Sequence, residues 1–109
     1  MKPLSIELTD DARSDAKHYM SFLANDRTGL DVQFAEAAEA TMDKLAEMPG
    51  LGSPYESDIP QLLTLRVYPV TGFPNHLILY REWGTVLKVV AVLHASLNLD
   101  RVLSRRLEL

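Results

Sequence analysis

The chain has 109 residues and no cysteine, and its 11 basic side chains against 15 acidic ones give a net charge of −4. This length fits a single domain, residues 1–109, and the lack of cysteine excludes disulfides, thiolate metal sites and a cysteine nucleophile. No apolar run approaches the ~20 residues that cross a bilayer and no apolar signal segment follows the first residues, so we expect a cytoplasmic protein with no membrane contact.

Residues 4–8 predict a first strand, because apolar and polar side chains alternate along them. Thr9 is a suitable N-cap, and the two aspartates after it favour the first turn of a helix. The apolar stripe of this helix consists of Ala12, Ala16, Tyr19, Met20 and Leu23, and Asp15 lies on its polar side. Residues 25–29 end the helix.

A second amphipathic helix follows, for which Thr28 is the expected N-cap. Pro49 and Gly50 end it. Its outer face is acidic, with Asp31, Glu36, Glu39, Asp43 and Glu47. Two such helices joined by a short turn predict an antiparallel hairpin, whose apolar side must pack on the second half of the chain.

A loop rich in proline and glycine occupies residues 50–60, and three strand-like runs follow at residues 63–70, 76–82 and 86–94. Short connections between these runs predict an antiparallel meander. Residues 98–107 are typical of a short C-terminal helix. The expected fold class is therefore α+β, in the order β-α-α-β-β-β, with a helical hairpin packed on a small antiparallel sheet, the first strand at its edge.

The charge is unevenly distributed. Residues 1–65 carry 5 basic and 12 acidic side chains, whereas residues 66–106 carry 6 basic and 2 acidic ones. The acidic charge belongs largely to the helical hairpin, so a binding surface for an acidic target is expected on the later strands and the C-terminal helix. Its candidate residues are Arg66, Arg81, Arg101, Arg105 and Arg106.

The usual catalytic and metal-binding signatures are missing, including a phosphate-binding glycine loop, a nucleophile elbow and histidines at ligand spacing, so no metal or cofactor is expected. His94 ends a strongly apolar run and would lie at the rim of the sheet. There it could act as a general acid or base, or simply form a hydrogen bond to a neighbouring loop. Arg66 and Arg81 could hold a phosphate or carboxylate, or pair with acidic residues of this chain.

The order of motifs resembles the ParE branch of the RelE/ParE superfamily of bacterial type II toxins. The resemblance covers nearly the whole chain and rests on residues 8–12, 48–54, 65–70, 76–81 and 92–94. It implies the fold expected above, and a non-enzymatic toxin that inhibits DNA gyrase. It also implies a cognate antitoxin, ParD-like with a ribbon-helix-helix DNA-binding part, which neutralises the toxin in a hetero-oligomer. This chain itself is not expected to bind a specific DNA sequence.

The antitoxin contact is expected in an apolar groove where the helical hairpin meets the sheet. Candidate residues are Tyr19, Phe22, Phe34 and Leu65, which are also ordinary candidates for the core. The basic residues given above are the candidates for contact with gyrase.

Two alternatives stay open. The RelE branch consists of ribosome-dependent mRNA endoribonucleases, and in this chain such chemistry would use Arg66, Arg81 and His94. Against it, Leu77 stands where that branch commonly has arginine, and neither tyrosine nor a basic side chain directly follows His94. The other alternative is a non-toxic relative that still binds an antitoxin.

Overall fold

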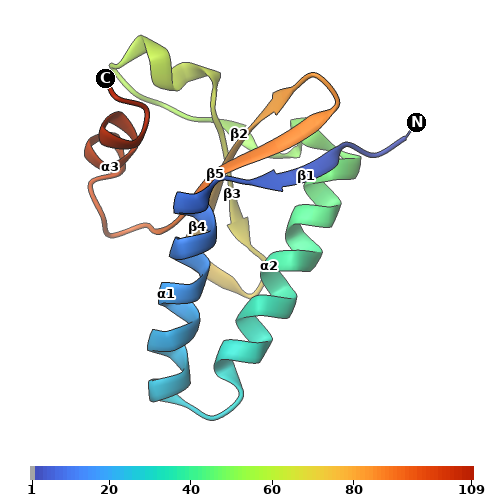
Figure 1. Ribbon diagram of the computed structural model, residues 1–109, viewed down its shortest axis with the longest axis vertical. Coiled ribbons are helices and arrows are strands. Elements are labelled where there is room, and N and C mark those ends of the chain that lie inside the picture. The colour runs from blue at the N-terminus through green and yellow to red at the C-terminus, as the bar shows by residue number, and fades with distance from the viewer. Residues whose placement is uncertain (1) are drawn as a thin grey trace.

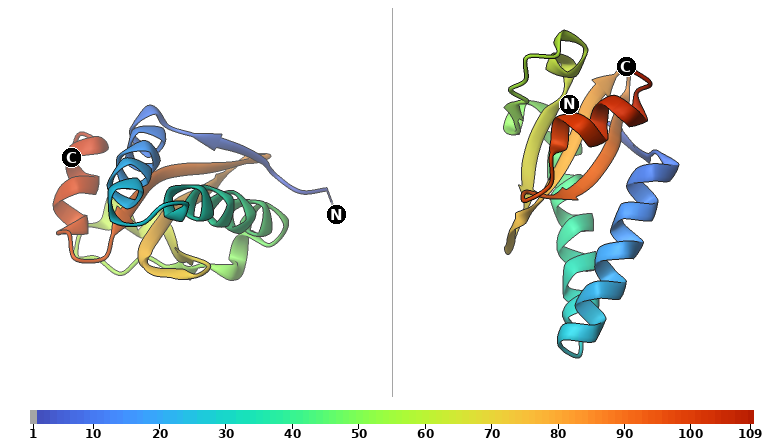
Figure 2. Two further views of the ribbon diagram at one scale, coloured as in Figure 1. Left: turned by 90° about the horizontal axis from the view of Figure 1, so that it is seen from below. Right: turned by 90° about the vertical axis from the view of Figure 1, so that its left-hand side faces the viewer.

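The computed structural model describes residues 2–109. In chain order the elements are β1 (Ser5–Leu8), α1 (Asp10–Asp26), α2 (Leu30–Glu47), the 3-10 helix η1 (Pro49–Leu51), β2 (Ser53–Pro54), the 3-10 helix η2 (Pro60–Thr64), β3 (Arg66–Val70), β4 (Phe73–Trp83), β5 (Val86–His94) and α3 (Leu99–Arg106). The α1–α2 hairpin projects beyond the sheet at its turn (Figure 1). The short helix α3 lies beside α1 and away from α2 (Figure 2).

The helical hairpin confirms the sequence prediction, with one correction at its turn. Thr9 caps α1 as expected, since its side chain accepts a hydrogen bond from the Ala12 N–H at 3.1 Å. Thr28 does not cap α2, however. The N-cap is Gly29, which has φ of 87° and makes no side-chain capping bond. Glycine enters this left-handed conformation at little cost, so the turn closes one residue later than predicted.

The sheet has five strands in the order β1-β5-β4-β3-β2. Strands β2 to β5 pair antiparallel, and β1 lies at the edge as predicted, but it runs parallel to β5, from Ser5 opposite Val86 to Leu8 opposite Val89. The expectation of an antiparallel sheet is therefore wrong for this strand. Strand direction depends on how the intervening elements return the chain to the sheet, and local periodicity carries no information about it.

The loop between α2 and β3 contains more structure than predicted. Its residues form η1, the two-residue strand β2 and η2, and consequently β3 begins at Arg66 and not at residue 63. A strand of two residues is too short to show alternation, and Pro60 starts a helical turn readily because its φ is fixed near the helical value. The remaining strands and α3 agree with the predicted elements to within a few residues.

Two apolar clusters lie on opposite faces of the sheet. The first, centred on Phe34, Ile78 and Tyr80, joins the sheet to the α1–α2 hairpin. The second, centred on Leu79 and Leu103, joins the other face to α3 and η2. Pairing along β4 and β5 skips a residue at Val90, a bulge that changes which side chains of β5 face each layer. Among the described residues, no helix is both long and apolar enough to span a membrane.

Candidate functional site

Helix α1 replaces a neighbouring strand along the outer edge of β5. β1 pairs with β5 only as far as Val89. Beyond it, Asp15 accepts a hydrogen bond from the Val92 N–H at 2.9 Å, and the Tyr19 hydroxyl accepts one from the His94 N–H at 2.9 Å. Four helical residues rise about 6 Å, and two strand residues advance about 6.6 Å. This match lets one face of α1 satisfy two successive donors of the strand.

A buried ion pair fixes α3 to the same place. Two nitrogens of the Arg106 guanidinium donate to the two carboxylate oxygens of Asp15 at 2.6 and 2.7 Å. The side chains are only 20% and 10% exposed, respectively. Hydrogen bonding to Asp15 raises the pKa of Arg106 above its ordinary value, which keeps the guanidinium charged. Asp15 is therefore not on a solvated face as predicted. The Arg106 guanidinium is paired with it inside the molecule.

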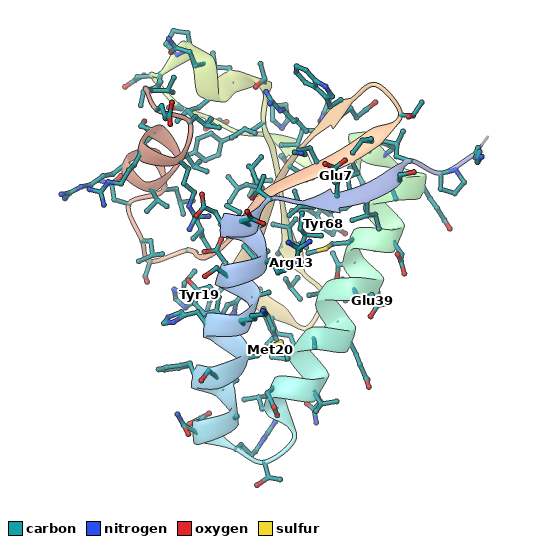
Figure 3. All side chains as sticks on the ribbon, viewed as in Figure 1. Glu7, Arg13, Tyr19, Met20, Glu39 and Tyr68 are labelled. Atoms are coloured by element: carbon teal, nitrogen blue, oxygen red, sulfur yellow. The ribbon has the colours of Figure 1, made fainter. Side chains whose placement is uncertain are left out.

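A cleft of about 540 Å³ opens beside this ion pair, between α1, the ends of β4 and β5, and α3. Tyr19 lies on the side of α1 that faces α3, whereas Met20 faces α2 (Figure 3). We call this hollow the histidine cleft, because all three histidines of the chain line it. Its lining residues are Asp15, His18, Tyr19, Phe22, Leu23, His76, Leu93, His94, Ser96, Leu97, Val102 and Arg106.

The aromatic rings of the cleft form a connected row. The ring centroids of His18 and Tyr19 are 5.2 Å apart, those of Tyr19 and His76 are 4.9 Å apart, and those of His76 and His94 are 5.1 Å apart, each pair in an edge-to-face arrangement. The sequence predicted no such meeting, since the three histidines are widely separated along it. The pairing of His76 with His94 across β4 and β5 brings them together.

His94 forms a hydrogen bond to a neighbouring loop, which is the second of the two roles left open for it. Its Nδ1 accepts a hydrogen bond from the Ser96 N–H at 3.1 Å and lies 2.8 Å from the Ser96 hydroxyl oxygen. This arrangement holds the turn that follows β5. The ring remains at the rim of the histidine cleft.

His76 is half-buried, because its ring packs against Phe34 and Tyr19. Burial, and then the charge of His94, lower its pKa.

The folded state therefore prefers neutral His76, whereas the unfolded chain takes up a proton near pH 6.5. Stability should be complete above about pH 6.5 and fall as the pH drops through the folded-state pKa. Thermal unfolding between about pH 8 and pH 5 measures this loss of stability. The loss should be smaller in His76→Phe and should persist in His18→Gln.

Arg66 and Tyr80 hold the segment after α2. The Arg66 guanidinium donates to the Gly52 carbonyl at 2.7 Å. The Tyr80 hydroxyl accepts from the Gly52 N–H at 2.9 Å and donates to the Pro49 carbonyl at 2.6 Å. Three of the motifs behind the family resemblance thus meet in one structural contact.

The three residues of the ribonuclease alternative do not converge. Arg66 lies opposite Tyr80 in the β3–β4 register and so shares its face of the sheet. Arg81 follows Tyr80 and projects from the other face, where it stacks 4.7 Å from the centre of the Trp83 ring. His94 pairs with His76, at the other end of β4. The three side chains thus lie on two faces of the sheet and toward opposite ends of β4.

The four residues expected to bind the antitoxin also separate. Tyr19 and Phe22 line the histidine cleft, and Phe22 is 67% exposed. Phe34 is fully buried in the cluster under the hairpin, and Leu65 is buried in the cluster on the opposite face. Of the five arginines on the basic side, Arg101 and Arg105 are exposed on α3 and take part in none of the ion pairs of residues 2–109.

Comparisons with known proteins agree with this architecture. A family model described as the ParE toxin of type II toxin-antitoxin system, parDE, matches residues 6–99. No protein with a curated description matches significantly. Among solved structures, a chain from the chromosomal ParDE TA system of P. aeruginosa superposes with a TM-score of 0.68 at 13% identity, covering 85% of this chain and 97% of that one. At this identity the likeness shows a shared fold.

Proposed function

The chain belongs to the ParE toxin family of type II toxin-antitoxin systems, and we propose that it inhibits DNA gyrase and is neutralised by direct binding of a cognate antitoxin. The observation that carries this proposal is the family match, which extends over residues 6–99 and so includes the helical hairpin and the three main strands. Gyrase acts on DNA inside the bacterial cell, so the proposed target implies a cytoplasmic site of action.

A non-enzymatic mode of action fits the distribution of charge. Cleavage of RNA needs an acid or base and several cations around one phosphate. Here Arg66 and Arg81 lie on opposite faces of the sheet, and His94 is hydrogen-bonded to the loop after β5. These positions favour a toxin that acts by binding over a ribonuclease.

For the antitoxin, we propose a ParD-like partner with a ribbon-helix-helix part, which forms a hetero-oligomer with the toxin. The contact involves Tyr19 and Phe22, which share the histidine cleft. Phe34 packs behind Tyr19, with ring centroids 6.5 Å apart, and Leu65 lies beneath the other face of the sheet. Phe34 therefore supports the surface from within, whereas Leu65 stays outside this contact.

For gyrase, we propose contact through Arg101 and Arg105, whose exposed guanidinium groups are not used in the ion pairs of the described chain. Arg81 with Trp83 forms a second candidate contact at the β4–β5 turn, where Trp83 is 65% exposed. Arg66 and Arg106 contribute indirectly, because they hold Gly52 and Asp15, respectively.

Supercoiling of relaxed plasmid by purified gyrase tests this function. Added toxin should block supercoiling and trap cleaved DNA, and Arg101→Gln with Arg105→Gln should reduce potency by roughly tenfold, as expected when contacts worth more than about 1 kcal/mol are lost. Arg13→Gln is the matched control, since Arg13 is exposed on α1 and paired with Asp10. Unchanged supercoiling at excess toxin would contradict the proposal, and new mRNA 5′ ends after induction would support the ribonuclease alternative instead.

A further inference from the structure

We propose that a second hollow, between α1, α2 and β1, docks a basic amphipathic helix of another protein. This hollow, which we call the hairpin groove, lies on the side of α1 where Met20 faces α2 (Figure 3), and it shares no lining residue with the histidine cleft. The site is independent of the proposed contacts with gyrase and the antitoxin. The residues that line the groove are Ile6, Leu8, Ala16, Met20, Phe34, Ala35, Ala38, Glu39, Met42 and Asp43.

The hairpin groove is apolar and partly open to solvent. Eight of its ten lining residues are apolar, and its volume of about 350 Å³ is in the range of pockets that hold part of a ligand or partner. Ile6 is 36% exposed, and Met20 and Ala35 are half-buried. The two helices thus leave an apolar face between them that a third element can cover.

The side chains of the groove suit a helix. Ala16 from α1 and Ala35 and Ala38 from α2 are small, so the backbone of another helix can approach closely. Met20 and Met42 are unbranched and flexible, and such side chains adapt to the surface that packs on them. An amphipathic helix that lays its apolar face into a groove of this kind is a recurring mode of recognition.

The charge of α2 selects a basic partner. None of the ion pairs among residues 2–109 includes a residue of this helix, and the amino group of Lys44, its one cation, lies beside the ring of Tyr68. Glu39 and Asp43 both line the groove, and carboxylates four positions apart on a helix repel each other. Lysine or arginine on a docked helix would relieve this repulsion. The acidic residues of α2 are Asp31, Glu36, Glu39, Asp43 and Glu47.

A second copy of this chain is a poorer occupant. Symmetric pairing through the hairpin groove would bring two acidic α2 helices together. The basic helix of the chain, α3, has no free apolar face to offer, because Leu99, Val102 and Leu103 pack in the cluster beneath it. Its position is also fixed by the ion pair between Arg106 and Asp15. The basic helix therefore has to come from a different protein.

Fluorescence anisotropy with the full chain and three labelled synthetic peptides tests the inference. The first peptide is a helix of about 16 residues with leucine on one face and lysine on the other. The second has glutamate in place of each lysine, and the third keeps the composition of the first but distributes the leucines around the helix. The first peptide should bind at least about tenfold more tightly than either of the others, and added salt should weaken its binding.

An arginine placed in the groove should block the site. Ala35→Arg should weaken binding of the first peptide by at least about tenfold, because it fills the groove and opposes the charge of the peptide. Ala40→Arg is the matched control, since it adds the same charge to the same helix at an exposed position outside the groove. Phe22→Ala should leave binding unchanged, because Phe22 lines the histidine cleft.

A second pair of variants changes charge without adding bulk. Glu39→Gln with Asp43→Asn should weaken binding of the first peptide by roughly tenfold, the loss of about 1.4 kcal/mol of interaction. Glu56→Gln with Asp58→Asn removes the same charge from exposed residues that line a different hollow, and should have little effect.

Three results would overturn the inference. They are equal binding of the three peptides, equal affinities for the groove variants and their controls, and loss of binding in Phe22→Ala. Sedimentation of the chain alone identifies the competing occupant. A dimer that Ala35→Arg dissociates would place a second copy in the groove and would also overturn the inference. A toxin that poisons gyrase but fails these tests would retain the proposed function and lose only this site.

Discussion

Asp15→Ala should destabilise the folded protein by about 3–5 kcal/mol, the usual cost of removing one partner of a buried ion pair. The variant leaves the Arg106 guanidinium, which is only 20% exposed, without its carboxylate. It also removes the acceptor of the buried Val92 N–H. Both groups then stay desolvated without a partner, and each such loss is costly by itself. Helix α3 should detach first, because the ion pair between Arg106 and Asp15 fixes it to α1.

Chemical denaturation of the wild type, Asp15→Ala, Arg106→Ala and the double variant measures this effect. The double variant should be far less destabilised than the sum of the single variants, because it removes both charges together. Glu7→Ala is the control, since Glu7 forms an ion pair of 2.9 Å with Lys88 while 58% exposed. A surface pair of this kind contributes only about 0–1 kcal/mol. A similar small loss for Asp15→Ala would show that the pair does not hold α3.

Gly52→Ala should be the other strongly destabilising change, at about 3 kcal/mol, the upper range for overpacking a core. A Cβ atom at this position would lie 2.4 Å from the Tyr80 hydroxyl oxygen and 2.9 Å from an atom of its ring. Tyr80 is fully buried and cannot retreat. The clash would displace either the ring or the segment after α2, and with it the hydrogen bonds from the Gly52 N–H and to the Pro49 carbonyl.

The requirement at Gly52 is steric and not conformational. Its φ of −70° and ψ of 153° are extended values that any residue adopts. Gly50→Ala is therefore a close control, because a Cβ there meets nothing within 4 Å, and it should change the melting temperature little. Tyr80→Phe in the Gly52→Ala background should not restore stability, since ring atoms at 2.9 and 3.0 Å remain too close. Equal melting temperatures for the two alanine variants would contradict this account.

The helices and most strands of the fold could be predicted from the sequence, because the patterns that indicate them are local. Alternation and a good N-cap placed the first strand and helix, and an acidic outer face identified the second helix, whose Glu36, Glu39 and Asp43 are exposed in the structure. The family resemblance was readable for a related reason. Its motifs are short segments with fixed structural tasks, such as the contact of Arg66 and Tyr80 with Gly52.

The candidate site could be predicted only in part from the sequence. Tyr19 and Phe22, both predicted to contact the antitoxin, line one hollow in the structure, and Arg101 and Arg105, both predicted to contact the target, are exposed. Their binding roles stay predictions. Helical periodicity placed Asp15 among polar residues, although its partners in β5 and α3 bury it. Periodicity reports only the face of a helix on which a residue lies, and cannot tell whether another element covers that face.

Local patterns thus determined which segments become helices and strands, where the acidic charge lies, and to which family the chain belongs. Tertiary packing determined the parallel pairing of β1, the separation of Arg66 from Arg81, and the meeting of three histidines in one cleft. The physical reason is sequence separation. The partners of Asp15 are 77 and 91 positions away along the chain, and contacts at such distances depend on strand register and on the path of the connecting loops.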